Sequence, residues 1–218
     1  MKNRTKLKKR IVIGILILVI IAAAAYVYNL LTEDTPEPPK TLEDYLYRYN
    51  ATPIGPDSEL LDPDRNIFSY EPYLEKDRYF RLWQGNVMVG YTMEEALDFN
   101  GAVGTISRYL WSLMNADYET HAALFADKVY FEECIPAYFT QQMIYGIEVE
   151  YLGSHEESAY FTVTYGILEN DLTYRIEMEE GKTQTQWFEL ISVNDAYKIN
   201  AIYTSPMAIV TIVEGSGT

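Results

Sequence analysis

The chain has 218 residues and a formal net charge of −15, from 17 lysines and arginines against 32 aspartates and glutamates. Six of the basic residues and no acidic ones precede Ile11, so the rest of the chain carries 11 basic and 32 acidic residues, or −21. This charge argues against binding to nucleic acid or anionic lipid head groups. The single cysteine excludes an internal disulfide, which is usual for a bacterial envelope protein that depends on its core.

The chain begins with a basic head, residues 1–10, followed by an apolar segment, residues 11–31. In this segment Tyr26 and Tyr28 are the only ionisable side chains. As a helix, the segment reaches about 31 Å, close to the thickness of the hydrocarbon core of a bilayer. We therefore expect one transmembrane helix. Because a basic flank marks the cytoplasmic side, everything after Leu31 is expected outside the cytoplasm.

The same segment also has features of a cleaved signal peptide. Residues 11–21 make an acceptable hydrophobic region, and the alanines at 22–25 provide small-residue cleavage sites. Against cleavage, the segment stays apolar beyond the alanines, at Tyr26, Val27 and Leu30, so that it is long enough to cross a bilayer. A single-pass anchor is the favoured interpretation, and a cleaved signal peptide is the alternative.

A linker and an N-terminal arm follow the apolar segment. Residues 32–40 hold three prolines and three acidic residues, a composition typical of an extended, stiff linker. The arm is expected at residues 41–100. It should open with a short helix at 41–50, with Thr41 as the N-cap, and continue as a loop at 51–66.

Two further elements are expected in the arm. Residues 78–91 predict a β-hairpin, because two apolar and aromatic runs flank the turn-forming residues 84–86. Thr92 followed by Glu95 is a capping box, which predicts a short helix at 93–99.

The clearest amphipathic helix is expected at residues 105–116, after a stretch at 101–104 that two glycines are expected to interrupt. Its apolar side chains fall at helical spacing and form one stripe: Ile106, Tyr109, Leu110, Leu113 and Met114. Asp117 is expected to cap a second helix at 118–126. A third helix is expected at 136–144, where a proline suits the first helical position.

After Gly146 the hydrophobic period changes from 3.6 to 2. Alternating apolar residues, separated by turn signals, predict five strands joined by short connections, near residues 147–151, 161–167, 172–178, 187–193 and 197–199. Residues 206–213 are expected to add a last edge strand, and residues 214–218 read as a flexible tail.

This order of elements predicts an α+β fold. The expected fold class is an N-terminal transmembrane helix, then helices packed on a curved, cone-like antiparallel sheet of about five strands. The cone-like domain is expected at residues 101–213.

The helix pair at residues 106–127 (ISRYLWSLMNADYETHAALFAD), with the short helix and tyrosine-rich strands after it, resembles the nuclear-transport-factor-2-like superfamily. That superfamily includes ketosteroid isomerases, and its first helix commonly breaks at a corner similar to residues 115–118 (NADY). The resemblance covers residues 101–203. It implies a cone-shaped α+β fold but no particular activity, because the superfamily hosts unrelated functions.

The layout of the whole chain is similar to that of one class of envelope protein. A basic head, a single span, a linker and an exported domain also occur, in this order, in bitopic assembly components of conjugative type IV secretion channels. Many Gram-positive envelope proteins share the layout. The similarity implies protein partners, with homo-oligomers as one form of assembly.

Catalytic members of the superfamily act from the interior of the cone, with Asp, His or Tyr placed against an apolar pocket. The equivalents here are Asp117, His121, Tyr165 and Tyr174, and no motif assigns any of them a role. An N-cap is the simpler interpretation of Asp117, and a hydrogen-bonded structural side chain that of His121. We therefore assign no catalytic residue.

No cofactor or metal is expected. The chain has two histidines and one cysteine, and His155 lies in an acidic turn. The loop at 62–73 begins like a calcium loop, but Ile67 replaces the turn glycine and Tyr73 the bidentate glutamate. The acidic neighbours of Cys134 should raise the pKa of its thiol rather than activate it.

The expected function is a membrane-anchored extracytoplasmic interaction domain, a non-catalytic component of a cell-envelope or secretion assembly. The alternative is a small-molecule-binding or isomerase-like enzyme that uses the interior of the cone. The enzyme requires a deep apolar pocket with a buried ionisable group. The interaction domain requires exposed tyrosines and no enclosed cavity.

Overall fold

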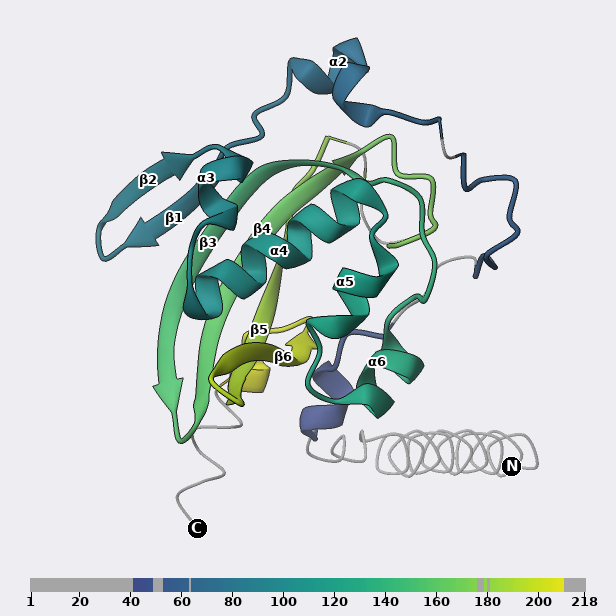
Figure 1. Ribbon diagram of the computed structural model, residues 1–218. Coiled ribbons are helices and arrows are strands. Elements are labelled where there is room, and N and C mark those ends of the chain that lie inside the picture. Colours follow the sequence, from purple (N-terminus) through teal and green to yellow (C-terminus); the bar gives the residue numbers. More distant parts are fainter. Residues whose placement is uncertain (1–40, 49–52, 63, 176–178, 180, 210–218) are drawn as a thin grey trace, which may run out of the picture. The chain divides into compact units, whose positions relative to one another are not determined.

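The computed structural model describes residues 41–48, 53–62, 64–175, 179 and 181–209 (Figure 1). These residues belong to one compact unit that begins at Thr41. The basic head, the predicted span and the linker, residues 1–40, lie outside the described residues, as does the tail at 214–218.

The described residues form an α+β domain. Its helices are η1 (Leu42–Tyr45), η2 (Ile67–Ser69), α2 (Glu71–Leu74), α3 (Met93–Leu97), α4 (Gly101–Asn115), α5 (Tyr118–Ala123) and α6 (Lys128–Cys134). Its strands are β1 (Phe80–Gln84), β2 (Val87–Tyr91), β3 (Met143–His155), β4 (Ser158–Leu168), β5 (Gln184–Val193) and β6 (Ala196–Tyr203). They form a six-stranded sheet in the order β2-β1-β3-β4-β5-β6.

The expected fold class is wrong. The sheet is mixed rather than antiparallel, because β1 runs parallel to β3, with Phe80 opposite Ile147 and Trp83 opposite Glu150. The sheet also has six strands rather than about five, since the β1–β2 hairpin of the predicted arm belongs to it. Within the ranges that the structure describes, no helix has the length and hydrophobicity needed to cross a membrane. The helix predicted at residues 11–31 lies outside those ranges.

Helix α4 covers the inner face of the curved sheet (Figure 1). The predicted apolar stripe of α4 is confirmed, since Ile106, Tyr109 and Leu110 are fully buried. Alternate residues of the strands face the helix, among them Ile147 and Val163, both also fully buried. One continuous core therefore joins α4 to the sheet.

Helix α4 begins a full turn earlier than predicted, because the glycines at its start belong to the helix. A Cβ atom at Gly104 would lie 1.9 Å from the carbonyl oxygen of Phe99, so the close approach of this backbone requires glycine. The helix ends at Ala116, whose left-handed backbone (φ 51°) lets the amide of Asp117 donate to the carbonyl of Ser112 at 2.9 Å. This turn makes the predicted corner between α4 and α5.

Several local predictions are confirmed. The hairpin turns at Gly85, whose φ is +62°. Thr92 and Glu95 form the capping box of α3, with the amide of Thr92 donating to the Glu95 carboxylate at 2.8 Å. Thr41 and Asp44 form a similar box, although the helix they begin, η1, is a single 3-10 turn.

Three predicted elements are wrong. The third helix, α6, precedes Pro136 instead of starting there, because the Asp127 side chain accepts from the amides of Val129 and Tyr130 and so fixes its start. The strand predicted at 172–178 is absent over its described part, 172–175, where Leu172 has φ +65°. Residues 207–209 are helical, so the described part of the last predicted strand is not a strand.

Candidate functional site

Three of the four candidate interior residues lie together in one buried aromatic cluster. His121, Tyr165 and Tyr174 are fully buried beneath α4 and α5. Asp117 is different: it lies at the exposed start of α5, where its Oδ1 accepts from the amide of Thr120 at 3.0 Å. Asp117 is therefore the N-cap that the sequence predicted.

The tyrosine hydroxyls of this cluster bond to one another. The Tyr109 and Tyr174 hydroxyl oxygens lie 2.5 Å apart, and the Tyr47 hydroxyl donates to the Tyr174 carbonyl oxygen at 3.2 Å. Burial, reinforced by the neighbouring Tyr165, holds the pKa of Tyr109 and that of Tyr174 well above the usual value. Both phenols therefore stay protonated at neutral pH and cannot act as bases.

Burial keeps the ring of His121 neutral, and one hydrogen bond defines its tautomer. The Ser112 hydroxyl donates to the Tyr109 carbonyl oxygen at 2.7 Å, so its oxygen accepts from His121 Nδ1 at 2.9 Å. The other ring nitrogen, Nε2, is then an unprotonated acceptor, buried with no hydrogen-bond partner among the described residues. Burial lowers the pKa of His121 to about 3, against a smaller opposing effect of Asp117.

Aromatic rings surround His121 and fill the space between helices and sheet. The ring centroids of Tyr109 and Phe139 each lie 5.1 Å from that of the imidazole, and that of Tyr174 lies 5.9 Å away. Five surface pockets of the described residues, of about 350 to 750 Å³, open to solvent. One of them is lined by Phe125 and Phe131, whose rings contact His121, but none of the five is lined by His121, Tyr109 or Tyr174. The interior thus has the packing of a core.

A cation is also buried in this interior. Arg175, 3% exposed, donates to the Tyr165 hydroxyl at 3.3 Å and to Gln184 Oε1 at 2.9 Å. Its guanidinium lies 5.2 Å from the ring centroid of Tyr47 and 5.6 Å from that of Tyr165. These contacts fix the charge between two rings.

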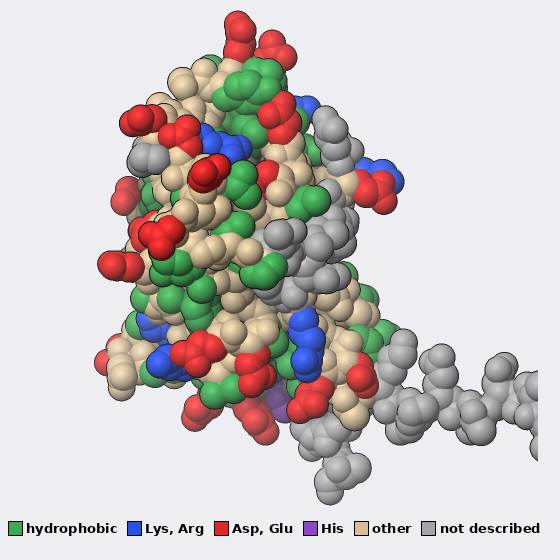
Figure 2. Space-filling view, turned by 90° about the vertical axis from the view of Figure 1, so that its right-hand side faces the viewer, with side chains coloured by type: hydrophobic (Ala, Val, Ile, Leu, Met, Phe, Trp, Pro, Cys, Tyr) green, Lys and Arg blue, Asp and Glu red, His purple; other side chains and the backbone are tan. Residues whose placement is uncertain are grey.

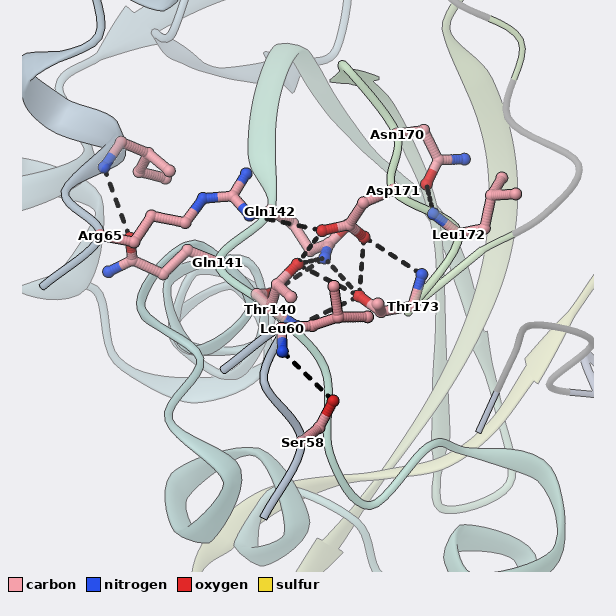
Figure 3. A network of polar contacts seen from close by, with 11 residues as sticks. Ser58, Leu60, Arg65, Thr140, Gln141, Gln142, Asn170, Asp171, Leu172 and Thr173 are labelled. Carbon is pink, nitrogen blue, oxygen red and sulfur yellow. Dashed lines mark hydrogen bonds and ion pairs between the residues drawn. The ribbon is translucent and has the colours of Figure 1, made fainter. Parts of the chain in front are cut away.

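A polar network joins the chain segments at the end of the sheet near the α4–α5 corner (Figure 3). The Asp171 carboxylate accepts from the Thr140 hydroxyl, from the Thr173 hydroxyl at 2.8 Å and from the Thr173 amide at 3.1 Å. Arg65 Nη1 lies 3.4 Å from the same carboxylate. Asp171 therefore ties the loop before η2 to the connection between β4 and β5.

Two further candidates from the sequence are Cys134 and the loop at 62–73. Cys134 is buried, and its pKa is raised mainly by burial and further by Glu133 and Asp127. In the predicted calcium-like loop, the Asp62 side chain accepts from the amide of Asp64 at 2.9 Å and so shapes a turn. Over the described residues, no three His, Cys, Asp or Glu side chains are grouped as metal ligands.

Of the 17 tyrosines among the described residues, eight are buried, six are half-buried and three are exposed. Tyr73, Tyr109, Tyr165 and Tyr174 are fully buried, whereas Tyr79 is 55% exposed. One face of the domain shows acidic side chains scattered from end to end with few basic ones (Figure 2). Sequence reasoning missed Tyr109 and Arg175 as parts of the interior cluster, because Tyr109 fits an ordinary helix stripe and Arg175 falls in a predicted strand.

Comparison of the chain with family models, with curated proteins and with solved structures gave no match. The resemblance to the nuclear-transport-factor-2-like superfamily stays a prediction.

Proposed function

We propose that the chain is a membrane-anchored, extracytoplasmic interaction domain, a non-catalytic component of a cell-envelope or secretion assembly. One observation carries the non-catalytic part of this proposal: the interior, where an isomerase-like enzyme would hold its substrate, is filled by packed aromatic side chains, and the hydroxyls of Tyr109 and Tyr174 share a hydrogen bond there. A substrate would have to displace these rings.

The state of the buried groups supports the same proposal. General acid–base catalysis near neutral pH needs a group whose pKa lies near the operating pH. His121 is held neutral with a pKa of about 3, and the pKa values of Tyr109 and Tyr174 are far above 10. The Asp171 network further joins the segments at one end of this interior.

The membrane part of the proposal is supported by the sequence of residues 1–31. A head with six basic residues before an uncharged segment of bilayer length favours insertion with the head in the cytoplasm. A tether of this kind raises the effective concentration of the domain near membrane partners, so weak surface contacts suffice.

The test is photo-crosslinking in native cells, with the full chain carrying a photoreactive residue at one surface position at a time. Exposed positions on separate faces, such as Tyr79, Val129 and Tyr151, sample the surface. We expect the chain in the membrane fraction and a discrete crosslink to another envelope protein or to a second copy from at least one position. A chain that is absent from the membrane fraction, or that gives no crosslink from any position, would contradict the proposal.

A further inference from the structure

A groove of about 360 Å³ lies at the surface between α2, the start of β1 and the α3–α4 helices. We call it the α2–β1 groove. Part of its wall is apolar: the ring centroids of Phe68 and Trp111 lie 5.6 Å apart, and the side chains of Leu74 and Tyr79, which also line the groove, are 46% and 55% exposed. This pairing of aromatic wall and exposed apolar rim is typical of a contact surface.

The groove also holds two cations. Lys76 and Arg78 line it and are half-buried, each against an aromatic ring: Lys76 Nζ lies 5.3 Å from the ring centroid of Tyr145, and the Arg78 guanidinium 5.3 Å from that of Tyr73. Over the residues that the structure describes, neither has a carboxylate partner, whereas nearby Arg81 is paired with Asp77.

These two cations share one groove although the chain is acidic. Beyond the basic head the chain carries −21, and among the described residues Arg65, Arg81, Lys128 and Lys182 form ion pairs, while Lys76 and Arg78 do not. Half-buried cations without an opposite charge are disfavoured, because burial removes part of their hydration. A carboxylate-bearing ligand would supply the missing charge and form charge-assisted hydrogen bonds.

We propose that the α2–β1 groove binds an acidic peptide segment of a partner protein, with an aromatic or branched aliphatic side chain against Phe68 and Trp111 and carboxylates against Lys76 and Arg78. This inference rests on the proposed function, because it gives the interaction domain a docking site. Glu94 also lines the groove and repels carboxylates that do not lie against Lys76 and Arg78.

An extended polypeptide fits this position better than a compact small molecule. The groove is open at the surface, and β2, whose last residue precedes the groove residue Thr92, is the free edge of the sheet. Val87 and Met88 on that edge are 62% and 41% exposed. An edge strand offers unpaired backbone groups to a chain that leaves the groove along it.

The test uses the full chain, purified in zwitterionic detergent, and a fluorescein-labelled probe peptide, Gly-Glu-Asp-Phe-Glu-Asp-Gly, whose binding is measured by fluorescence anisotropy. Two control peptides replace the phenylalanine with alanine or all four acidic residues with lysine. We expect the acidic phenylalanine probe to bind and the lysine peptide not to bind. The alanine peptide should bind about tenfold more weakly, since it lacks the buried ring.

Two double variants with the same change in charge locate the site. K76E/R78E reverses the groove cations, and K128E/K182E reverses two exposed lysines elsewhere, which pair with Glu132 and Glu179. We expect K76E/R78E to weaken binding of the probe at least about tenfold. K128E/K182E should weaken it less than about twofold. If thermal unfolding shows that K76E/R78E does not fold, K76Q/R78Q replaces it.

Equal losses in the two double variants, or no binding at about 1 mM probe, would overturn the inference. The crosslinking experiment does not use the probe, so the two proposals fail separately. Crosslinks to a partner without probe binding would contradict the proposed peptide-binding groove and leave the proposed interaction domain standing. Probe binding with no crosslink from any surface position would contradict the proposed function as an interaction domain and support only the peptide-binding groove.

Discussion

The interior cluster and the α2–β1 groove both combine aromatic rings with ionisable side chains, but the groove is open to solvent and the interior is buried. In the interior, His121 is held neutral with a pKa of about 3, and the phenols are bonded to one another or to carbonyl groups. In the groove, Lys76 and Arg78 lie against rings and reach the surface, with no carboxylate partner among the described residues. The interior is thus organised for stability and the groove for contact.

The largest expected effect follows from removing a ring of the interior. Tyr109→Ala deletes a fully buried ring that contacts His121, Phe125 and Phe188 and leaves the Tyr174 hydroxyl without its bond. We expect a loss of about 3 to 5 kcal/mol in the free energy of unfolding, measured by denaturant titration. Tyr151→Ala, at a side chain 51% exposed, is the matched control and should cost less than about 1 kcal/mol.

The second effect is a pH dependence of stability. The folded-state pKa of His121 is lowered to about 3 from 6.5, so its contribution is fully present above pH 6.5 and is lost as the pH falls from 6.5 through 3. Between pH 6.5 and pH 5 the protonation of this one group in the unfolded state should lower the free energy of unfolding by about 2 kcal/mol. His121→Phe removes the titrating group, and its stability should fall less over this range than that of the wild type.

The control for this titration is Val129→Ala, at an exposed side chain that does not titrate, and it should keep the wild-type profile. Identical pH profiles for the wild type and His121→Phe would show that the imidazole of His121 is already reached by water.

The third effect concerns the network at Asp171. Asp171→Asn keeps the shape of the side chain but removes the charge that accepts from Thr140 and Thr173 and faces Arg65. We expect a loss of about 1 to 3 kcal/mol, measured by thermal unfolding. Asp195→Asn, in the exposed β5–β6 turn, removes the same charge and should change stability by less than about 0.5 kcal/mol. A similar loss for both variants would mean that the network contributes only general charge effects.

The smallest effect is expected in the groove. Lys76→Gln with Arg78→Gln should change the free energy of unfolding by less than about 1 kcal/mol, because surface charges contribute little to folding. A large loss in thermal unfolding would indicate that these cations stabilise the fold, as the interior groups do.

Local chemistry explains which elements could be predicted from the sequence. The capping box at Thr92, the N-cap at Asp117 and the turn at Gly85 all depend on residues a few positions apart. The parallel pairing of β1 with β3 joins Phe80 to Ile147, and no local pattern encodes it. From the sequence, Gly104 predicts an interruption of the helix. In the structure it lies within α4, where the carbonyl of Phe99 leaves no room for a Cβ atom.

The interior site was predicted in part, for a similar reason. From the sequence, His121 is interpreted as a hydrogen-bonded structural side chain, and in the structure it is fully buried with Nδ1 bonded to the Ser112 hydroxyl. Its tautomer depends on Ser112 in another helix and on the carbonyl that this serine binds, and the sequence does not show either contact. Asp171 reads as an ordinary turn residue, because its partners Arg65 and Thr140 are distant in the chain.

The central claim is that the interior is a closed core in which His121 and the tyrosines stay neutral and the charge of Arg175 is held between two rings, so that function lies on the surface. The most direct measurement is an NMR titration of the His121 imidazole in the full chain between about pH 8 and pH 5. We predict a neutral ring, protonated at Nδ1, with no titration over this range. Titration near the ordinary pKa of histidine, about 6.5, would contradict the account, because it would show that water reaches the interior.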